Sequence, residues 1–228
     1  MLTLVAVVAF GRLGVWQLHR AAEKQALLTQ FESGQTTTVA LSSGNADSLP
    51  RYQRVELHGR YDGEHQVLLD NMPSAQGQAG YRVLTPVALE QGGSLLVDRG
   101  WLPLGTTRSE LPDTAIDDKA RTIVGRLDEL PEPGVRLGDN PTADPAVSWP
   151  RVLSFPRYEE LTRALNRPLR RRIVLLDSAQ PDGYERVWQA HFGFGPERHI
   201  AYAAQWFALA VAAAVIYLMM SLQREPSA

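Results

Sequence analysis

Cysteine is absent from this chain of 228 residues. Its absence excludes a disulfide framework, thiolate metal sites and a cysteine nucleophile, and it leaves the redox compartment of the protein undecided. A strong charge of either sign is absent as well, because 23 Lys and Arg residues face 25 Asp and Glu residues and the formal net charge is −2. This balance gives no reason to expect a nucleic-acid partner.

Sequence signatures of catalysis are missing too. The chain has no G-x-S-x-G elbow, no phosphate-binding glycine loop and no H-E-x-x-H helix. Carboxylates are plentiful, but their spacing picks out no acid–base pair. We therefore expect a protein that is not an enzyme.

Charge is also absent from residues 200–220, which form a long apolar run. As a helix this run would measure roughly 31 Å, about the thickness of the hydrocarbon core of a bilayer. Arg198 and Arg224 bracket it, and Tyr202 and Tyr217 lie near its two edges, where interfacial aromatic residues are common. A buried helix of a soluble protein is the alternative, but the bracketing charges favour a transmembrane helix.

The N-terminal apolar run is shorter, because Arg12 interrupts it. A signal peptide is the alternative here, yet no basic segment precedes the run and no A-x-A cleavage site follows it. Instead the chain continues as a helix-favouring stretch over residues 19–31. We expect a retained transmembrane helix whose true start lies a few residues upstream, with Arg12 either extending to the membrane surface or facing the second helix.

The middle of the chain is typical of β structure. Residues 54–61 alternate with a period of two, as in a half-buried strand. Pro156 and Pro168 bracket one amphipathic helix, expected at residues 158–166. Further strands are expected at residues 66–70, 81–89, 94–98, 122–127, 152–153, 172–176 and 185–191, and loops at 71–80 and 130–150.

The predicted fold class is a membrane-anchored α+β protein, in which two transmembrane helices flank a mainly antiparallel β domain, either a sheet or a small barrel, with one short helix. Both termini then lie on one side of the membrane, although the charges near the helix ends do not decide which side. The expected segments are transmembrane helix 1–18, helix extension 19–31, β-rich domain 32–198, transmembrane helix 199–222 and a C-terminal tail 223–228.

Three motifs stand out in chain order. They are LGVWQLHR at residues 13–20, GYRVLTP at 80–86 with LVDRGWLP at 96–103, and PERHIAYAAQWF at 196–207. Together they resemble the Surfeit locus protein 1 family, whose members are assembly factors for haem–copper cytochrome c oxidase. The resemblance covers nearly the whole chain, including both apolar ends.

This resemblance implies a factor that receives haem a from haem a synthase and aids its insertion into oxidase subunit I. It implies a protein of the bacterial inner membrane whose β domain faces the periplasm, so that the lipid bilayer is a further partner. It also implies that the histidine of the R-H-x-x-Y-A-x-Q-W motif, His199, ligates haem iron. A scaffold that stabilises an assembly intermediate of subunit I without ligating haem is the alternative.

The residues themselves are compatible with a haem site at the mouth of the second span. A neutral imidazole such as that of His199 is a good axial ligand for haem iron. Tyr202, Ala203 and Trp206 share a helix face with it, and Ala203 leaves room beside a flat macrocycle. The expected haem-binding residues are His199, Tyr202, Gln205, Trp206, Trp16 and Gln17, with His199 as the metal ligand. An interfacial aromatic belt beside a solvated histidine is the other interpretation.

Other candidates carry weaker expectations. His191 and His19 are possible second ligands or haem-edge contacts, whereas His58 and His65 are expected to be structural. Residues 98–101 (DRGW) suggest a corner that determines the fold, with docking near the membrane as the alternative. The arginines of residues 167–172 suggest a solvated edge strand, with contact to haem propionates or anionic headgroups as the alternative. Ala204, Ala208 and Ala212 recur every four positions and suggest a helix–helix contact.

Overall fold

The computed structural model describes residues 2–34, 37–42, 44–108, 110–133, 148–188 and 194–222. Two compact units make up the chain. The helical unit combines Met1–Glu32 with Ala190–Ala228, and the β domain comprises Ser33–Gln189.

The helical unit contains α1 (Leu2–Ser33) and α3 (Pro196–Leu222). Within the described residues, α3 is the one helix that is long and apolar enough to cross a membrane. In α1, Arg12, Gln17 and His19 lower the hydropathy of the corresponding stretch. The helix expected over residues 1–31 is confirmed from residue 2 onward, but a membrane crossing by α1 stays a prediction.

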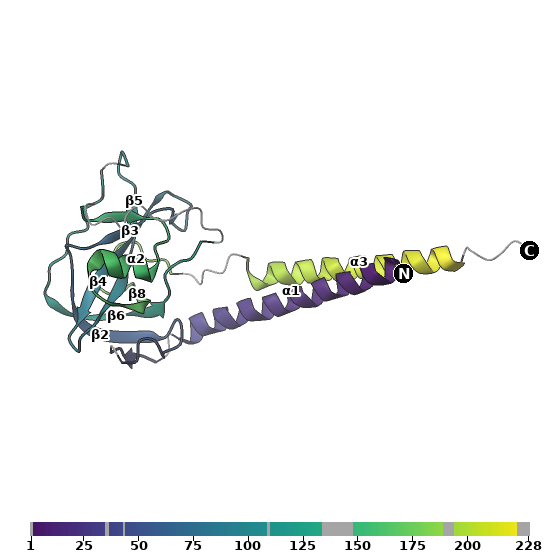
Figure 1. Ribbon diagram of the computed structural model, residues 1–228, viewed down its shortest axis with the longest axis horizontal. Coiled ribbons are helices and arrows are strands. Elements are labelled where there is room, and N and C mark those ends of the chain that lie inside the picture. The colour runs from purple at the N-terminus through teal and green to yellow at the C-terminus, as the bar shows by residue number, and fades with distance from the viewer. Residues whose placement is uncertain are drawn as a thin grey trace, which may run out of the picture. The chain divides into compact units, whose positions relative to one another are not determined.

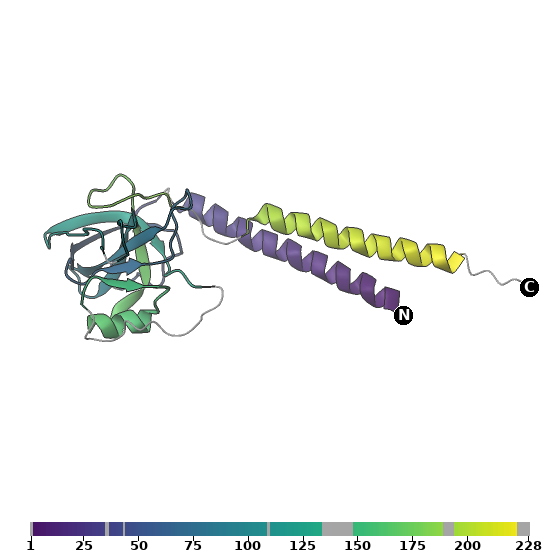
Figure 2. The same ribbon diagram turned by 90° about the horizontal axis from the view of Figure 1, so that it is seen from above.

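The two helices run antiparallel, side by side (Figure 1, Figure 2). The Phe10 and Trp206 rings stack with centroids 5.7 Å apart, and Gln17 contacts His199. Later residues of α1 therefore contact earlier residues of α3, as in an antiparallel pair. Buried and half-buried positions recur at steps of three and four on both helices, the spacing of left-handed helix pairs. They include Thr3, Val7, Phe10, Gly14, Gln17 and Ala21 on α1, and His199, Ala203, Trp206, Ala210 and Ala213 on α3.

The helix contact therefore does not use the stripe expected from the sequence. Ala204, Ala208 and Ala212 are exposed, so that prediction is wrong. The neighbouring stripe, which contains the buried Ala203, faces α1 instead. Every-fourth spacing occurs on several faces of an alanine-rich helix, and the bulky Trp206 and Phe207 rings decide which face packs.

The β domain contains eight strands and one helix, α2 (Tyr158–Leu165). The strands are β1 (Val39–Ala40), β2 (Arg54–Tyr61), β3 (Val67–Leu69), β4 (Gly80–Leu89), β5 (Ser94–Pro103), β6 (Ala120–Asp128), β7 (Arg151–Leu153) and β8 (Leu169–Leu176). Because β2 pairs with both β6 and β4, strands β2, β6, β8, β5 and β4 close into a ring. The small barrel, and not the open sheet, is the alternative that forms.

Strand direction differs from the mainly antiparallel expectation, because the sheet is mixed. The pairs β1–β2, β3–β7 and β5–β8 are parallel. The connection from β5 to β8 contains β6, β7 and α2, which is long enough to return the chain for a parallel pairing. Hydrophobic alternation reports which side chains are buried but not the direction of the neighbouring strand.

Two apolar clusters hold the domain together. Val55, Leu57 and Leu95 belong to the first cluster, to which β2, β5, β6 and β8 all contribute. Leu161 of α2 packs in the second cluster with Leu96, from the alternate positions of β5. The central strand β5 is consequently buried from Ser94 to Trp101, on both of its faces.

Of the remaining expectations for secondary structure, some are confirmed and others are wrong. The helix at residues 158–166 is confirmed as α2, and residues 71–79 are irregular as expected. The strand expected at residues 185–191 is wrong over 185–188, where Glu185 forms only an isolated bridge with Trp101. Residues 189–191, and most of the loop expected at 130–150, lie outside the described residues. The short strand β1 was not expected.

Candidate functional site

The candidate site lies in the helical unit, where the first turn of α3 meets α1. Pro196 opens α3, a position at which the missing N–H of proline costs nothing. His199 follows one turn later and is half-buried. Its Nδ1 lies 2.7 Å from Oε1 of Gln17 on α1. The first and third sequence motifs therefore meet at a side-chain hydrogen bond.

This hydrogen bond determines what His199 can offer to a ligand. An amide oxygen only accepts hydrogen bonds, so Nδ1 of the imidazole must donate and must carry the proton. In a neutral ring the second nitrogen, Nε2, then keeps its lone pair. His199 thus offers one nitrogen, Nε2, whose lone pair can bind a metal.

Small residues bring the two helices close beside this pair. Gly14 and Ala203 are buried, and a Cβ atom added to Gly14 would lie 2.6 Å from the Phe207 ring. Gly14 is one turn before Gln17, and Ala203 is one turn after His199. The hydrogen bond consequently sits at the edge of a closely packed helix contact.

The structure separates the other candidate residues. Trp206 is on the packed face of α3 and stacks on Phe10, whereas Tyr202, 41% exposed, and Gln205 are exposed. Trp16 is 52% exposed and contributes to a shallow depression on α1. Of the six candidates, His199 and Gln17 are in direct contact. The other four make no described contact with His199.

The depression on α1 also contains two residues with open expectations. Arg12 and His19 line it together with Val8, Gly11, Val15 and Trp16. These positions lie on the side of α1 that points away from α3, so Arg12 does not face the second helix. His19 is likewise separated from His199, and His191 lies outside the described residues.

In the β domain, the DRGW segment supports the structural interpretation. It lies within β5, so the corner expected at residues 98–101 is wrong, and Asp98 is completely buried. The Asp98 carboxylate forms an ion pair with Arg82 and accepts a hydrogen bond from the Gly100 N–H at 3.0 Å. Burial raises the pKa of Asp98, while the cation of Arg82 opposes this rise. Gly100 has a φ of 111°, which favours glycine.

Arg99 is buried at the next position without a described carboxylate partner. Its Nη1 donates to Oε1 of Gln66 and to the Thr114 carbonyl, each at 3.0 Å, and its Nε donates to the Asp182 carbonyl at 2.7 Å. The guanidinium also lies 4.9 Å from the Tyr184 ring centroid. Burial lowers the pKa of Arg99. These contacts tie three segments distant in sequence to β5.

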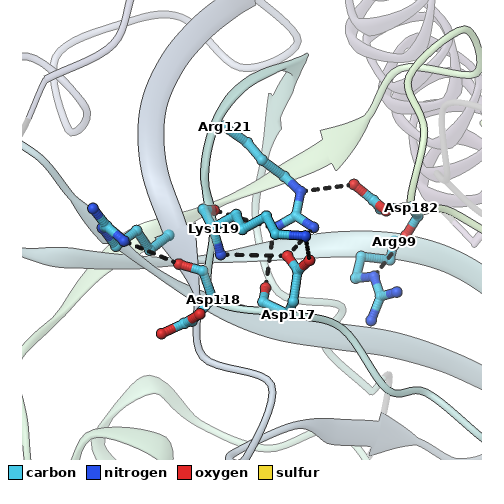
Figure 3. Close-up of polar contacts among 7 residues, drawn as sticks. Arg99, Asp117, Asp118, Lys119, Arg121 and Asp182 are labelled. Atoms are coloured by element: carbon cyan, nitrogen blue, oxygen red, sulfur yellow. Dashed lines mark hydrogen bonds and ion pairs between the residues drawn. The ribbon is translucent and has the colours of Figure 1, made fainter.

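A second layer of ion pairs lies outside Arg99 (Figure 3). Arg121 binds the carboxylates of Asp117 and Asp182, and Lys119 lies 2.7 Å from Asp117. Hydrogen bonds from Lys119 and then Arg121 lower the pKa of Asp117 to about 2. This network was not expected from the sequence. Its only local signal is the four-residue spacing of Asp117 and Arg121.

The arginines of residues 167–172 are neutralised locally. Arg167 binds Asp62, Arg171 binds Glu159, Arg172 lies 2.8 Å from Glu129, and Arg170 is 3.6 Å from Asp47. Because β8 pairs with β5 and β6, the edge-strand interpretation is wrong. The paired charges also give little support to a role in binding propionates or headgroups.

The two histidines expected to be structural do make local contacts. His58 lies 2.9 Å from the Thr122 hydroxyl across the β2–β6 pair. His65 is 2.9 Å from Asp62, and its ring meets Trp149 edge-on. Neither forms part of the site in the helical unit.

Comparison with known proteins agrees with the three motifs. The family model described as "SURF1 family" matches residues 4–211. A SURF1-like protein of Rickettsia felis is 25% identical over 224 residues, covering 96% of this chain and 95% of the relative. A SURF1-like protein of Monosiga brevicollis is 25% identical over 232 residues, covering 95% and 84%. The family match spans most of the chain, including α1, the β domain and the first half of α3, and the chain therefore belongs to the SURF1 family.

Proposed function

We propose that this protein is a membrane-anchored assembly factor for haem–copper cytochrome c oxidase, which binds haem a through His199 and aids its insertion into subunit I. The oxidase-assembly role rests on what the family resemblance implies. The haem role rests on the chemistry of the helical unit. In this proposal the protein is a carrier and not a catalyst.

The observation that carries the proposal is the Gln17–His199 hydrogen bond. Histidines that ligate metals usually donate their second ring N–H to an oxygen acceptor, which holds the ring and its tautomer. His199 has this arrangement within the protein, with Nε2 left as the donor to iron. One nitrogen donor suits haem, because the macrocycle supplies four nitrogens and the protein supplies only axial ligands.

The position of His199 along α3 also suits haem a. The uncharged run begins at the next residue, Ile200, so that His199 lies at the boundary between polar and apolar sequence. Haem a has an isoprenoid tail that favours lipid and propionates that favour water. A ligand at this boundary lets both ends of the haem keep the solvent that they favour.

In this proposal the neighbouring side chains differ in whether they contact haem. The exposed Tyr202 ring and Gln205 amide are free to contact a macrocycle on the outer side of α3. Trp206 is engaged with Phe10 and contributes mainly to helix packing. Trp16, on the far side of α1, fits an interfacial anchor better than a haem contact.

Membrane topology follows in the same proposal. The antiparallel pairing of α1 with α3 (Figure 1, Figure 2) supports two spans, and the family resemblance implies a bacterial inner membrane with both termini in the cytoplasm and the β domain in the periplasm. Haem a synthase would supply the haem at the membrane, and subunit I would receive it. The scaffold alternative needs the same topology and the same oxidase partner but no haem.

Co-expression with the enzymes of haem a synthesis, followed by purification in detergent, separates the two functions. A haem carrier shows a Soret band at a defined haem-to-protein ratio, whereas a scaffold shows none. Expression of the chain in cells that lack haem a synthesis is the control, because adventitious haem b would also absorb there. A parent protein that never retains haem a would contradict the carrier function and favour the scaffold.

A further inference from the structure

The polar contact inside the helical unit needs an explanation of its own. Gln17 and His199 are 182 residues apart in sequence and come from different helices. Gln17 lies near the end of an apolar stretch of α1, residues 2–18, in which Arg12 is the one charged residue. An amide in such a stretch needs a hydrogen-bond partner when the helix is removed from water. His199 is its described partner.

We propose that Gln17 is a positioning residue for His199. The Gln17 amide oxygen holds the imidazole as the Nδ1–H tautomer, so that Nε2 keeps its lone pair and is the iron ligand. This inference rests on the proposed function. It assigns to Gln17 an action through His199, in place of the direct haem contact expected from the sequence.

The physical reason lies in tautomer choice and ring rotation. A neutral imidazole exchanges its proton between two nitrogens, and only the deprotonated nitrogen can bind iron. Without an acceptor at Nδ1, His199 would divide between tautomers and ring orientations. A fixed oxygen 2.7 Å from Nδ1 selects one of them before haem arrives. The imidazole is then already ordered in the folded protein, so haem binding does not lose free energy in ordering it.

The packing around the pair makes the acceptor rigid. Gln17 follows the buried Gly14 by one turn, and His199 precedes the buried Ala203 by one turn. Both ends of the hydrogen bond are thus anchored where the helices are closest. As a consequence, His199 is preorganised only while α1 and α3 are paired in this register.

The first test uses the haem-free protein. Nitrogen-15 NMR of the His199 ring in detergent distinguishes a protonated Nδ1 from a protonated Nε2. We expect the Nδ1–H tautomer in the parent and in Gln17→Glu, whose carboxyl oxygen can also accept. We expect a mixture of tautomers in Gln17→Leu, which keeps the helix propensity of the side chain but has no hydrogen-bonding group. Gln25→Leu is the matched control, because Gln25 is an exposed glutamine on the same helix.

The second test uses haem. Loss of an outer partner of a metal ligand typically weakens metal affinity by about 10- to 100-fold. We expect Gln17→Leu to lose haem affinity within that range and to raise the haem midpoint potential, because its imidazole is less basic. Gln17→Glu should restore affinity and lower the potential, and Gln25→Leu should match the parent. If Gln17 had a purely structural role, the two substitutions would not shift the haem midpoint potential in opposite directions.

The failures of the two proposals remain distinguishable. An Nε2–H tautomer in the parent, or Gln17→Leu with the parent's ring signals and haem affinity, would overturn the positioning role even if His199 binds haem. If no variant and no parent binds haem, the proposed function fails. The NMR measurement still decides in that case whether Gln17 sets the tautomer.

Discussion

At the residue scale, the β domain contains an ion pair between Asp98 and Arg82 whose carboxylate is completely buried. Asp98 is fully buried and comes from β5, while Arg82 comes from the neighbouring strand β4. A register shift between Arg82 and Leu84 marks an irregularity in β4 beside Asp98. The same carboxylate holds the Gly100 N–H. Removal of this carboxylate would leave the half-buried Arg82 cation and the buried Gly100 N–H without their partner.

We therefore expect Asp98→Ala to lower the free energy of unfolding by about 3–5 kcal/mol, the usual cost of breaking a buried pair. Denaturant unfolding of the full chain in detergent, followed by tryptophan fluorescence, measures this loss. Asp47→Ala is the control, because its carboxylate is 56% exposed and faces Arg170 at 3.6 Å; the expected change is below about 0.5 kcal/mol. Equal effects of the two substitutions would contradict the structural role of Asp98.

A second residue-scale prediction concerns pH. Burial disfavours ionisation of Asp62, but hydrogen bonds from His65 and Arg167 outweigh it and lower the pKa of this carboxyl. The folded pKa of Asp62 is thus below its unfolded value of about 3.9. Its contribution to stability is complete above the unfolded pKa and disappears as the pH falls through the folded pKa.

Acid unfolding curves of the parent and Asp62→Asn test this sign. The parent should lose stability as the pH falls below about 4, and Asp62→Asn should be less stable at neutral pH but lose less over the acid range. Asp47→Asn serves as the control with a parent-like acid profile. A parallel pH dependence of Asp62→Asn and the parent would refute the assignment.

At the element scale, the sequence predicted strands well where burial alternates simply. Residues 54–61 match β2 because every second side chain points into the apolar core. The strand predicted over residues 94–98 stopped short of Pro103, since Asp98 and Arg99 beside Gly100 suggested a corner and not a continuing strand. Their burial depends on Arg82 and Gln66, which lie elsewhere in the chain. Ring closure through the β2–β4 pairing is non-local in the same way and left no sequence signal.

The helix pair supplies the element-scale prediction. A side chain at Gly14 would meet the Phe207 ring, whereas nothing lies within 4 Å of a Cβ at Gly11. Gly14→Leu should therefore separate α1 from α3 and break the Gln17–His199 hydrogen bond. Gly11→Leu should preserve both.

The protein has no native cysteine, so single cysteines report this pairing without interference. A cysteine replacing Ala21 places one thiol on the packed face of α1, and a cysteine replacing Pro196 places a second thiol at the start of α3. Oxidative crosslinking should fall by at least several fold in Gly14→Leu and remain near the parent level in Gly11→Leu. Equal crosslinking in both variants would show that Gly14 does not set the helix contact.

At the scale of the whole molecule, topology is the property that function requires. A cysteine replacing Gln91, in the exposed β4–β5 turn, should react with a membrane-impermeant thiol reagent in cells with a permeable outer membrane. A cysteine appended after residue 228 should react only after lysis. Labelling of both positions from the same side would contradict the two-span arrangement.

The candidate site was predictable in part. The motifs at the two ends of the chain placed Trp16, Gln17 and His199 at one membrane level. The rotation of α1 against α3 decides that Gln17 contacts His199 and that Trp16 points away. This rotation follows from side-chain packing between helices far apart in sequence, notably at Gly14 and Phe207, and not from the spacing within either motif.

Haem titration of His199→Gly, with and without imidazole, decides whether His199 ligates haem iron. If Nε2 of His199 ligates iron, the parent binds haem a with an imidazole-ligated spectrum, His199→Gly loses that spectrum, and added imidazole restores it by occupying the vacated position. His19→Gly, on the other face of α1, should behave like the parent. Retention of the parent spectrum by His199→Gly without imidazole would contradict the account, and its loss in His19→Gly would assign the iron to the other histidine.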